Sequence, residues 1–215
     1  MSEAEGEKRA AAEAAARLVE DGMAVGLGTG STVSFLLPAL AGRGLELRCV
    51  ATSPQTEEAA VALGLRVEPF ESLDRLDIAV DGADQIDPAG WLVKGGGCAH
   101  TREKVVAAAA DRFLVIASAD KLVQALSPPV PLELLPFGLA ATLRALGPAE
   151  LRDAPPSPDG GIIADYLGAV DDPPELAARL GGTPGVVEHG LFPPELVTEI
   201  LVGRDGKVER IEVAG

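Results

Sequence analysis

The 215-residue chain has few cysteines and no long apolar run. Cys49 and Cys98 lie far apart and form neither a C-x-x-C pair nor a metal-binding spacing, which predicts no disulfide and a reducing compartment. No stretch approaches the roughly 20 apolar residues that a membrane-spanning helix needs. The first ten residues, MSEAEGEKRA, are polar and acidic, unlike a secretory signal peptide. These features predict a cytoplasmic protein without a membrane anchor.

Positive charge and aromatic residues are also scarce. The 18 Lys and Arg face 33 Asp and Glu, which gives a net charge of −15. A nucleic-acid partner requires a basic surface, so this balance argues against one. An anionic ligand would need a local positive site to overcome the overall negative field. Because only 3% of the residues are aromatic, the core must consist mainly of Ala, Val, Leu and Ile.

Apolar runs alternate with helical patterns over residues 1–127. Ser2 and Glu5 form a capping box, and Ser53 followed by Pro54 marks another helix start. Strands are expected at 23–28, 45–52, 65–70, 77–81, 91–94 and 113–118. Helices are expected from the capping box to about residue 20 and at 31–42, 54–63 and 101–111. The alternation predicts an α/β domain with a doubly wound parallel sheet.

The pattern changes after the proline-rich segment at 127–131, so a smaller α+β domain is expected over residues 128–194. Its predicted elements are strand 130–135, helix 137–147, strand 149–154, strand 161–167, helix 173–181 and strand 185–189. The order β-α-β-β-α-β is that of a ferredoxin-like domain. Residues 195–213 predict a hairpin that turns at Asp205-Gly206, and residues 195–215 are expected to return to the first domain.

Two glycine-rich segments are candidate ligand-binding loops. GLGTGST (26–32) sits at a strand-to-helix turn, where backbone amides and hydroxyls suit one phosphate group, although a capped tight turn is the alternative. It has neither the Walker ending nor the G-x-G-x-x-G spacing, which argues against a triphosphate or a dinucleotide. KGGGCAHTREK (94–104) sets Lys94 before three glycines and Glu103 in the first turn of a helix. A structural glycine loop with an ordinary acidic helix start is the alternative there.

Three aspartates follow a buried strand in DIAVDGADQID (77–87). Asp81, Asp84 and Asp87 recur at steps of three, and unpaired carboxylates are costly to bury. A cation site is one interpretation, but the EF-hand spacing is absent and the only two histidines, His100 and His189, are scattered. In another, Asp81 caps a turn and Asp84 and Asp87 are solvated. The third is a polyol site, since ligands of open α/β sheets bind beyond the carboxyl ends of the strands.

Five motifs together resemble ribose-5-phosphate isomerase, type A: GLGTGST, DGADQID, KGGGCAHTREK, VPLELLPFG and GVVEHGLF. The similarity runs from the first helix to the last hairpin in the family's order. It implies a Rossmann-like domain with a smaller α+β domain, and a homodimer. It also implies interconversion of ribose 5-phosphate and ribulose 5-phosphate through an enediol(ate), with a small sugar phosphate as ligand and with neither metal nor cofactor.

The resemblance also implies roles for single residues. Glu103 is similar to the general base that moves a proton between C2 and C1. Lys94 is similar to the cation that stabilises the oxyanion, together with the backbone amides of Gly95, Gly96 and Gly97. Asp81 and Asp84 match residues that hold sugar hydroxyls and assist ring opening. The remaining expected substrate contacts are Thr29, Gly30, Ser31, Thr32, Gly82, Ala83, Lys121 and Lys8.

One segment departs from the family pattern. Where relatives often carry T-D-N-G-N, this chain has SPDGGIIAD (157–165), which puts the hydrogen bonding of that turn in doubt. Two other function classes use related folds. A coenzyme A transferase would use a glutamate as covalent nucleophile, but the chain is short and the aspartates would be unexplained. A non-catalytic sugar-phosphate sensor would need a DNA-binding module, and none is expected before residue 20.

Overall fold

The computed structural model describes residues 2–73 and 75–213 and divides the chain into two compact units. Unit 1 comprises Met1–Ala83, Arg102–Leu122 and Pro194–Gly215, and unit 2 comprises Asp84–Thr101 and Val123–Pro193. Residues 84–101 therefore group with the second unit. Among the described residues, no helix combines the length and the apolar character needed to cross a bilayer.

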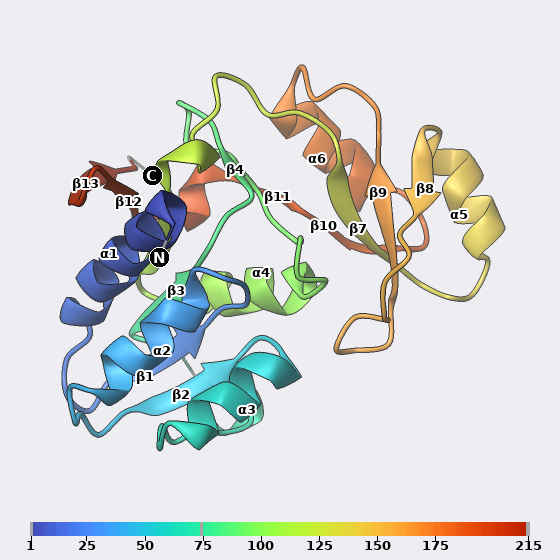
Figure 1. Ribbon diagram of the computed structural model, residues 1–215. Helices are drawn as coiled ribbons and strands as arrows, with labels where there is room; N and C mark the ends of the chain where they lie inside the picture. The colour runs from blue at the N-terminus through green and yellow to red at the C-terminus, as the bar shows by residue number, and fades with distance from the viewer. Residues whose placement is uncertain (1, 74, 214–215) are drawn as a thin grey trace. The chain divides into compact units, whose positions relative to one another are not determined.

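Unit 1 is built on a six-stranded sheet with the order β13-β12-β6-β3-β1-β2 (Figure 1). Its strands are β1 (Ala24–Leu27), β2 (Arg48–Ala51), β3 (Ile78–Asp81), β6 (Phe113–Ser118), β12 (Glu199–Arg204) and β13 (Lys207–Glu212). All neighbouring pairs are parallel except β12 and β13. This confirms the predicted parallel sheet, and the C-terminal strands β12 and β13 form one edge of it.

The helices of unit 1 begin where side chains cap them. Ser2 and Glu5 form the predicted capping box of α1 (Glu3–Arg17), which ends three residues before the predicted limit, and Ser53 caps α3 (Pro54–Ala62). The other α-helices are α2 (Val33–Ala41) and α4 (His100–Ala108), and the first two residues of α4 fall in unit 2. The 3-10 helices are η1 (Phe70–Ser72), η2 (Ala119–Lys121) and η3 (Pro194–Leu196).

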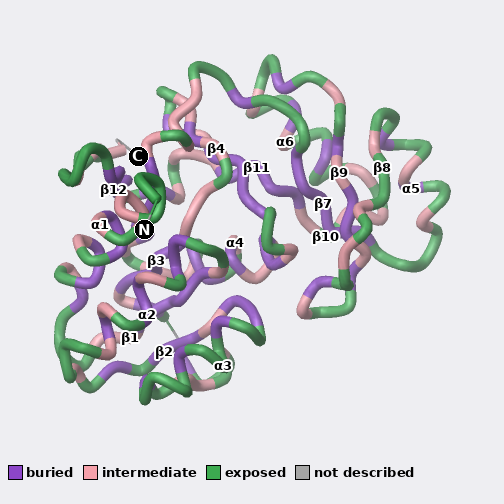
Figure 2. Tube along the Cα trace, in the orientation of Figure 1, coloured by how far each residue is buried: buried purple, intermediate pink, exposed green. Residues whose placement is uncertain are grey.

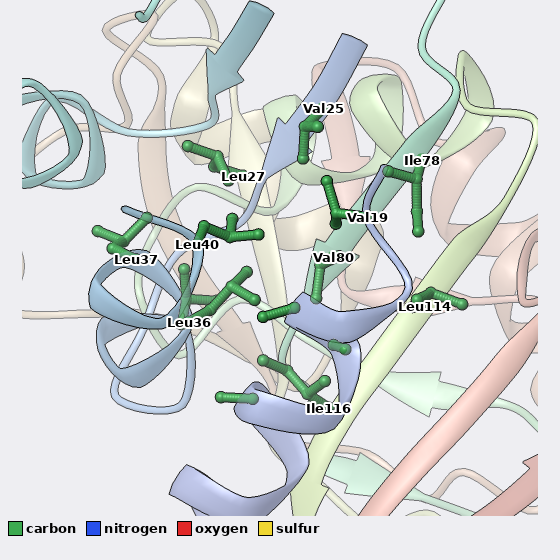
Figure 3. Packing of buried hydrophobic residues seen from close by; sticks show 14 of the residues in the cluster. Val19, Val25, Leu27, Leu36, Leu37, Leu40, Ile78, Val80, Leu114 and Ile116 are labelled. Carbon is green, nitrogen blue, oxygen red and sulfur yellow. The ribbon is translucent and has the colours of Figure 1, made fainter. Parts of the chain in front are cut away.

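The core of unit 1 fills the face of the sheet that carries α1 and α2. Successive side chains of a strand alternate between the two faces of its sheet. Figure 3 shows this cluster, whose labelled members are Val19, Val25, Leu27, Leu36, Leu37, Leu40, Ile78, Val80, Leu114 and Ile116. The opposite face meets α4, because a Cβ built at Gly26 would lie 2.4 Å from Val106 and 3.0 Å from the Ala79 methyl. Helices on both faces make the sheet doubly wound.

Unit 2 contains a four-stranded antiparallel sheet with the order β10-β7-β9-β8. The elements are β7 (Val130–Leu134), α5 (Leu139–Leu146), β8 (Ala149–Leu151), β9 (Ile162–Tyr166), α6 (Pro173–Gly181) and β10 (Val186–His189). The first strand lies between the fourth and the third, which confirms the ferredoxin-like arrangement. Figure 2 shows β7 buried and much of α5 exposed.

Two features differ from the predicted elements. The strand expected at 65–70 is wrong: only a bridge between Val67 and Cys49 forms, and Pro69, which has no amide hydrogen, ends the segment before η1. A second, three-stranded sheet in unit 2 was not predicted as such; it has the order β11-β5-β4, and its strands β11 (Leu191–Phe192), β5 (Leu92–Val93) and β4 (Gln85–Ile86) are two residues long.

Candidate active site

In unit 1, the loop after β1 packs tightly against the end of β3. The buried carboxylate of Asp81 accepts hydrogen bonds at Oδ1 from the amides of Thr29 at 3.1 Å and Gly82 at 2.7 Å. A Cβ at Gly28 would lie 2.0 Å from that carboxylate. Position 28 therefore has to be glycine for Asp81 to approach the loop. The strand-to-helix loop and the first aspartate of the cluster form one structural piece.

The hydroxyl groups of this loop have identifiable partners in unit 1. Thr29 Oγ1 lies 2.8 Å from Thr52 Oγ1, and Ser31 Oγ accepts a hydrogen bond from Lys8 Nζ at 2.9 Å. Thr32, only 9% exposed, precedes α2 and makes no side-chain cap hydrogen bond. Lys8 thus brings one positive charge from α1 to the loop, which is the kind of local cation that an anion site needs in an acidic protein.

Glu103 lies in the first turn of α4 and is only 3% exposed. The positive end of the helix dipole favours an acidic side chain at this position. A carboxylate that is both buried and near a helix N-terminus is suited to proton transfer, since solvent cannot compete for the proton.

Lys121 ends η2, with its Nζ 3.3 Å from Asp120 Oδ2 and its side chain about one third exposed. The pKa of Asp120 lies below its usual value because its carboxylate accepts a hydrogen bond from Ser118 Oγ, with the Lys121 charge as a smaller cause. The Ala119 amide donates to Glu7 Oε2 at 3.1 Å, which ties η2 to α1. The backbone that carries Lys121 is therefore fixed to α1 within unit 1.

In unit 2, Lys94 directly follows β5 and is 3% exposed. Its amide donates to the carbonyl of Gly190 at 2.8 Å, and its Nζ lies 5.3 Å from the centre of the Phe192 ring. Such a cation–π contact stabilises an ammonium group that has lost part of its hydration. Phe192 belongs to the GVVEHGLF motif, which places two of the five motifs beside each other.

The glycine segment after Lys94 forms a tight turn. Gly95 and Cys98 have positive φ angles of 109° and 61°, and the Cys98 amide donates to the Gly95 carbonyl at 3.1 Å. The amide of Gly96 donates to Asp84 Oδ2 at 2.8 Å. The resemblance predicts that the amides of three glycines face an oxyanion, but the amide of Gly96 points at Asp84. Gly96 and Gly97 are both exposed.

The three aspartates of the cluster have different surroundings. Asp87 Oδ1 accepts hydrogen bonds from the amides of Ala89 and Trp91, both at 2.9 Å, and so closes the turn before β5. Asp84 is exposed and contacts the glycine turn, whereas Asp81 is buried against the loop after β1. Asp87 therefore has a structural role in a turn, whereas the turn-cap interpretation left this carboxylate solvated.

The turn in which this chain departs from the family pattern is fully hydrogen-bonded. Ser157 Oγ accepts from the amides of Asp159 at 3.2 Å and Gly161 at 2.9 Å, and donates to Glu133 Oε1 at 2.6 Å. The buried Glu133 also accepts a hydrogen bond from the Thr101 hydroxyl at the start of α4. Ser157 is thus the centre of the hydrogen bonds in this turn.

One residue near the glycine turn was missed by the sequence. Arg152 Nη1 donates to the Gly95 carbonyl at 2.9 Å, and Nε donates to Asp165 Oδ2 at 2.9 Å. The pKa of Arg152 is raised, first by its hydrogen bonds to Asp165. A separation of 57 residues from Gly95 gives no local signal that could have revealed this contact.

The metal interpretation has no geometric support in the described part of the chain. Within residues 2–73 and 75–213, no group of three or more His, Cys, Asp or Glu side chains is arranged to hold a metal ion.

Comparisons with known proteins agree on one family. The family model described as ribose 5-phosphate isomerase A (phosphoriboisomerase A) matches residues 48–207. Ribose-5-phosphate isomerase A of Rhodopseudomonas palustris strain HaA2 is 46% identical over 219 residues, with 93% of this chain and 94% of the relative covered.

Solved structures give the same result. Ribose 5-phosphate isomerase A of Neisseria gonorrhoeae is similar with a TM-score of 0.92 at 31% identity, covering 97% of this chain and 96% of that one. A D-ribose-5-phosphate isomerase in complex with phospho-erythronic acid has a TM-score of 0.91 at 34% identity, covering 99% and 100%.

Proposed function

The chain belongs to the ribose 5-phosphate isomerase A family, which interconverts ribose 5-phosphate and ribulose 5-phosphate, and we propose that it does so by metal-independent proton transfer with Glu103 as the base. The observation that carries this proposal is the burial of Glu103 in the first turn of α4, nine residues after the buried Lys94. One carboxylate and one cation are the minimum that the reaction needs.

The reaction moves one proton between neighbouring carbons. Glu103 takes the proton from C2 of the open-chain aldose, and the electron pair moves to form an enediol(ate) between C1 and C2. The same carboxyl group then returns the proton to C1, while the O2 hydrogen leaves and O1 gains a hydrogen. This proton is removed only if the carbonyl oxygen is stabilised as negative charge develops on it, which is the role proposed for Lys94.

The aspartates are proposed to hold the sugar. Asp81, fixed by the amides of Thr29 and Gly82, would accept hydrogen bonds from sugar hydroxyls and assist ring opening. Asp84, oriented by the Gly96 amide, would do the same. The backbone of Gly82, Ala83, Gly95 and Gly97 would complete these contacts.

The loop Thr29–Thr32 is proposed to bind the phosphate, with Lys8 and Lys121 supplying positive charge. The contact between Lys8 and Ser31 supports this role for Lys8. The phospho-erythronic acid bound by one similar isomerase carries a phosphate and a planar carboxylate, which resembles the planar enediolate. We propose that this chain binds the same acid, which makes it a probe that requires no turnover.

Metal independence has a direct test. The protein is incubated with excess chelator, and the chelator is then removed by gel filtration. We expect the rate of ribulose 5-phosphate formation from ribose 5-phosphate to be unchanged by this treatment. A metal-assisted hydride shift would instead lose its Lewis acid. Loss of activity that a divalent ion restores would contradict the proposed enediol route.

The phosphate loop can be tested at Ser31. In Ser31→Ala or Thr32→Ala, we expect the dissociation constant for phospho-erythronic acid to rise by about 10- to 150-fold, since each change removes one hydrogen bond to a charged group. Some loss of turnover is also expected where phosphate binding supports the transition state. Ser34→Ala, which removes a hydroxyl bonded to the Ser31 carbonyl, is the matched control. Normal affinity in both loop variants would make the loop structural.

We also propose that the enzyme is cytoplasmic and a homodimer. The family resemblance supports the dimer, and the acidic, disulfide-free composition supports a reducing compartment. Light scattering coupled to size-exclusion chromatography would measure the mass in solution, and a value near that of one 22.0 kDa chain would contradict the dimer.

A further inference from the structure

Arg152 fastens the glycine turn of unit 2 to the four-stranded sheet. It directly follows β8, and its Nη1 donates to the Gly95 carbonyl at 2.9 Å while lying 3.7 Å from Cys98 Sγ. The same carbonyl accepts the Cys98 amide at 3.1 Å. Cys98, at the far end of the turn, has a positive φ of 61°, and in a residue other than glycine such a conformation persists only where the surrounding structure holds it.

The guanidinium group is itself fixed before it reaches the turn. Nε donates to Asp165 Oδ2 at 2.9 Å and Nη2 donates to Oδ1, which forms a two-bonded fork with a carboxylate on β9. The two side chains are only about one fifth exposed. A forked Arg–carboxylate pair has a defined geometry that a lysine cannot reproduce. Nη1 therefore points at Gly95 from a rigid base.

The carbonyl that Arg152 holds belongs to the same peptide group as the Gly96 amide. In a planar trans peptide, C=O and N–H point in opposite directions, so fixing one fixes the other. The N–H side of this peptide donates to Asp84 Oδ2 at 2.8 Å. A positive charge on the carbonyl side also polarises the peptide and strengthens its N–H as a donor. Asp165, Arg152, the Gly95–Gly96 peptide and Asp84 thus form one chain of hydrogen bonds.

We propose that Arg152 is a positioning residue for the isomerisation, acting on the Asp84 carboxylate through the Gly95–Gly96 peptide. The proposal rests on the sugar-binding role proposed above for Asp84. Arg152 itself touches no reacting atom. The effect of replacing Arg152 should therefore disappear when residue 84 can no longer accept the hydrogen bond from the Gly96 amide.

A double-mutant cycle tests this. We expect Arg152→Met to lower kcat/KM for ribose 5-phosphate by about 10- to 100-fold, as small misplacements of substrate-holding groups do. In the Asp84→Ala background, where residue 84 cannot accept the Gly96 amide, the same change should cost less than about 3-fold, because residues that act as a unit are not additive. Arg152→Lys should behave like Arg152→Met, since it keeps the charge but loses the fork. The same cycle is measured on the dissociation constant of phospho-erythronic acid, which needs no turnover.

A matched control variant and the melting temperature of each variant distinguish a positioning role of Arg152 from a general loss of protein stability. Arg179 lies in the same unit and donates to the Tyr166 hydroxyl at 2.7 Å, so Arg179→Met removes a comparable arginine and should leave kcat/KM unchanged. If Arg152→Met does not fold, Arg152→Lys carries the cycle. Equal losses in both Asp84 backgrounds, or no loss at all, would overturn the positioning role. A parent protein without isomerase activity would instead overturn the proposed function.

Discussion

Replacing Glu103 by glutamine is expected to lower turnover of ribose 5-phosphate by about 10²- to 10⁴-fold, the usual contribution of a general base. Glutamine keeps the shape of the side chain and its hydrogen-bonding capacity but cannot take the C2 proton. Because Glu103 is buried in the first turn of α4, water has little access to replace it. The KM for ribose 5-phosphate should change little, since the carboxylate acts on the reacting carbon rather than on the phosphate.

Solvent exchange provides a readout specific to proton transfer. In deuterium oxide, exchange of the C2 hydrogen of ribose 5-phosphate, followed by NMR, should fall in parallel with turnover for Glu103→Gln. Glu57→Gln is the matched control, since Glu57 lies in the first turn of α3 but is exposed. If Glu103→Gln turns over and exchanges like the parent, Glu103 is not the base, and Asp81 becomes the next candidate.

Much of the fold follows from local patterns in the sequence. The run at 113–118, apolar except for Ser118, matches β6 residue for residue, as expected for a strand that is buried on both faces. Ser53 with Pro54 fixes the start of α3, and Asp205-Gly206 adopts two positive φ angles that suit a tight hairpin. In each case one or two residues have a backbone preference strong enough to decide the structure.

The predicted elements are wrong or missing where strand pairing, rather than the local hydrophobic pattern, determines the secondary structure. Residues 65–70 look like a strand, but Cys49 exchanges hydrogen bonds only with Arg66 and Glu68 before Pro69 ends the pairing. The two-residue strands β4 and β11 are too short to show any periodicity. Tertiary partners, which no local pattern contains, determine both outcomes.

The candidate site shows the same division. The glycines, the aspartates and Glu103 are visible in the sequence because each stands in a short motif. That Asp87 closes a turn while Asp81 packs on Gly28 depends on hydrogen bonds to residues that the spacing does not specify. Arg152 is the extreme case, since its contact with Gly95 joins β8 to a segment that precedes it by 57 residues.

Gly28→Ala is expected to lower kcat/KM by about 10²-fold, although Gly28 has no reactive group. The added Cβ would lie 2.0 Å from Asp81 Cγ and Oδ1 and 2.5 Å from Asp81 Cβ. Contacts this short extend to the Cβ of a short side chain, so a rotamer change cannot relieve them and the strand end or the loop must shift. A shift of about 1 Å at a substrate-holding group costs about that factor in rate. The stability should fall by about 1–3 kcal/mol through overpacking.

Gly181→Ala separates this local effect from a general intolerance of alanine. A Cβ at Gly181, at the end of α6, would lie 3.7 Å from His189 Nε2, an ordinary contact, so activity and melting temperature should stay at the parent values. The fall in kcat/KM of Gly28→Ala should be seen at temperatures well below the melting temperature of this variant, where the protein is folded. If Gly28→Ala keeps parental kcat/KM, the close packing of Asp81 on the loop does not set the geometry of the site.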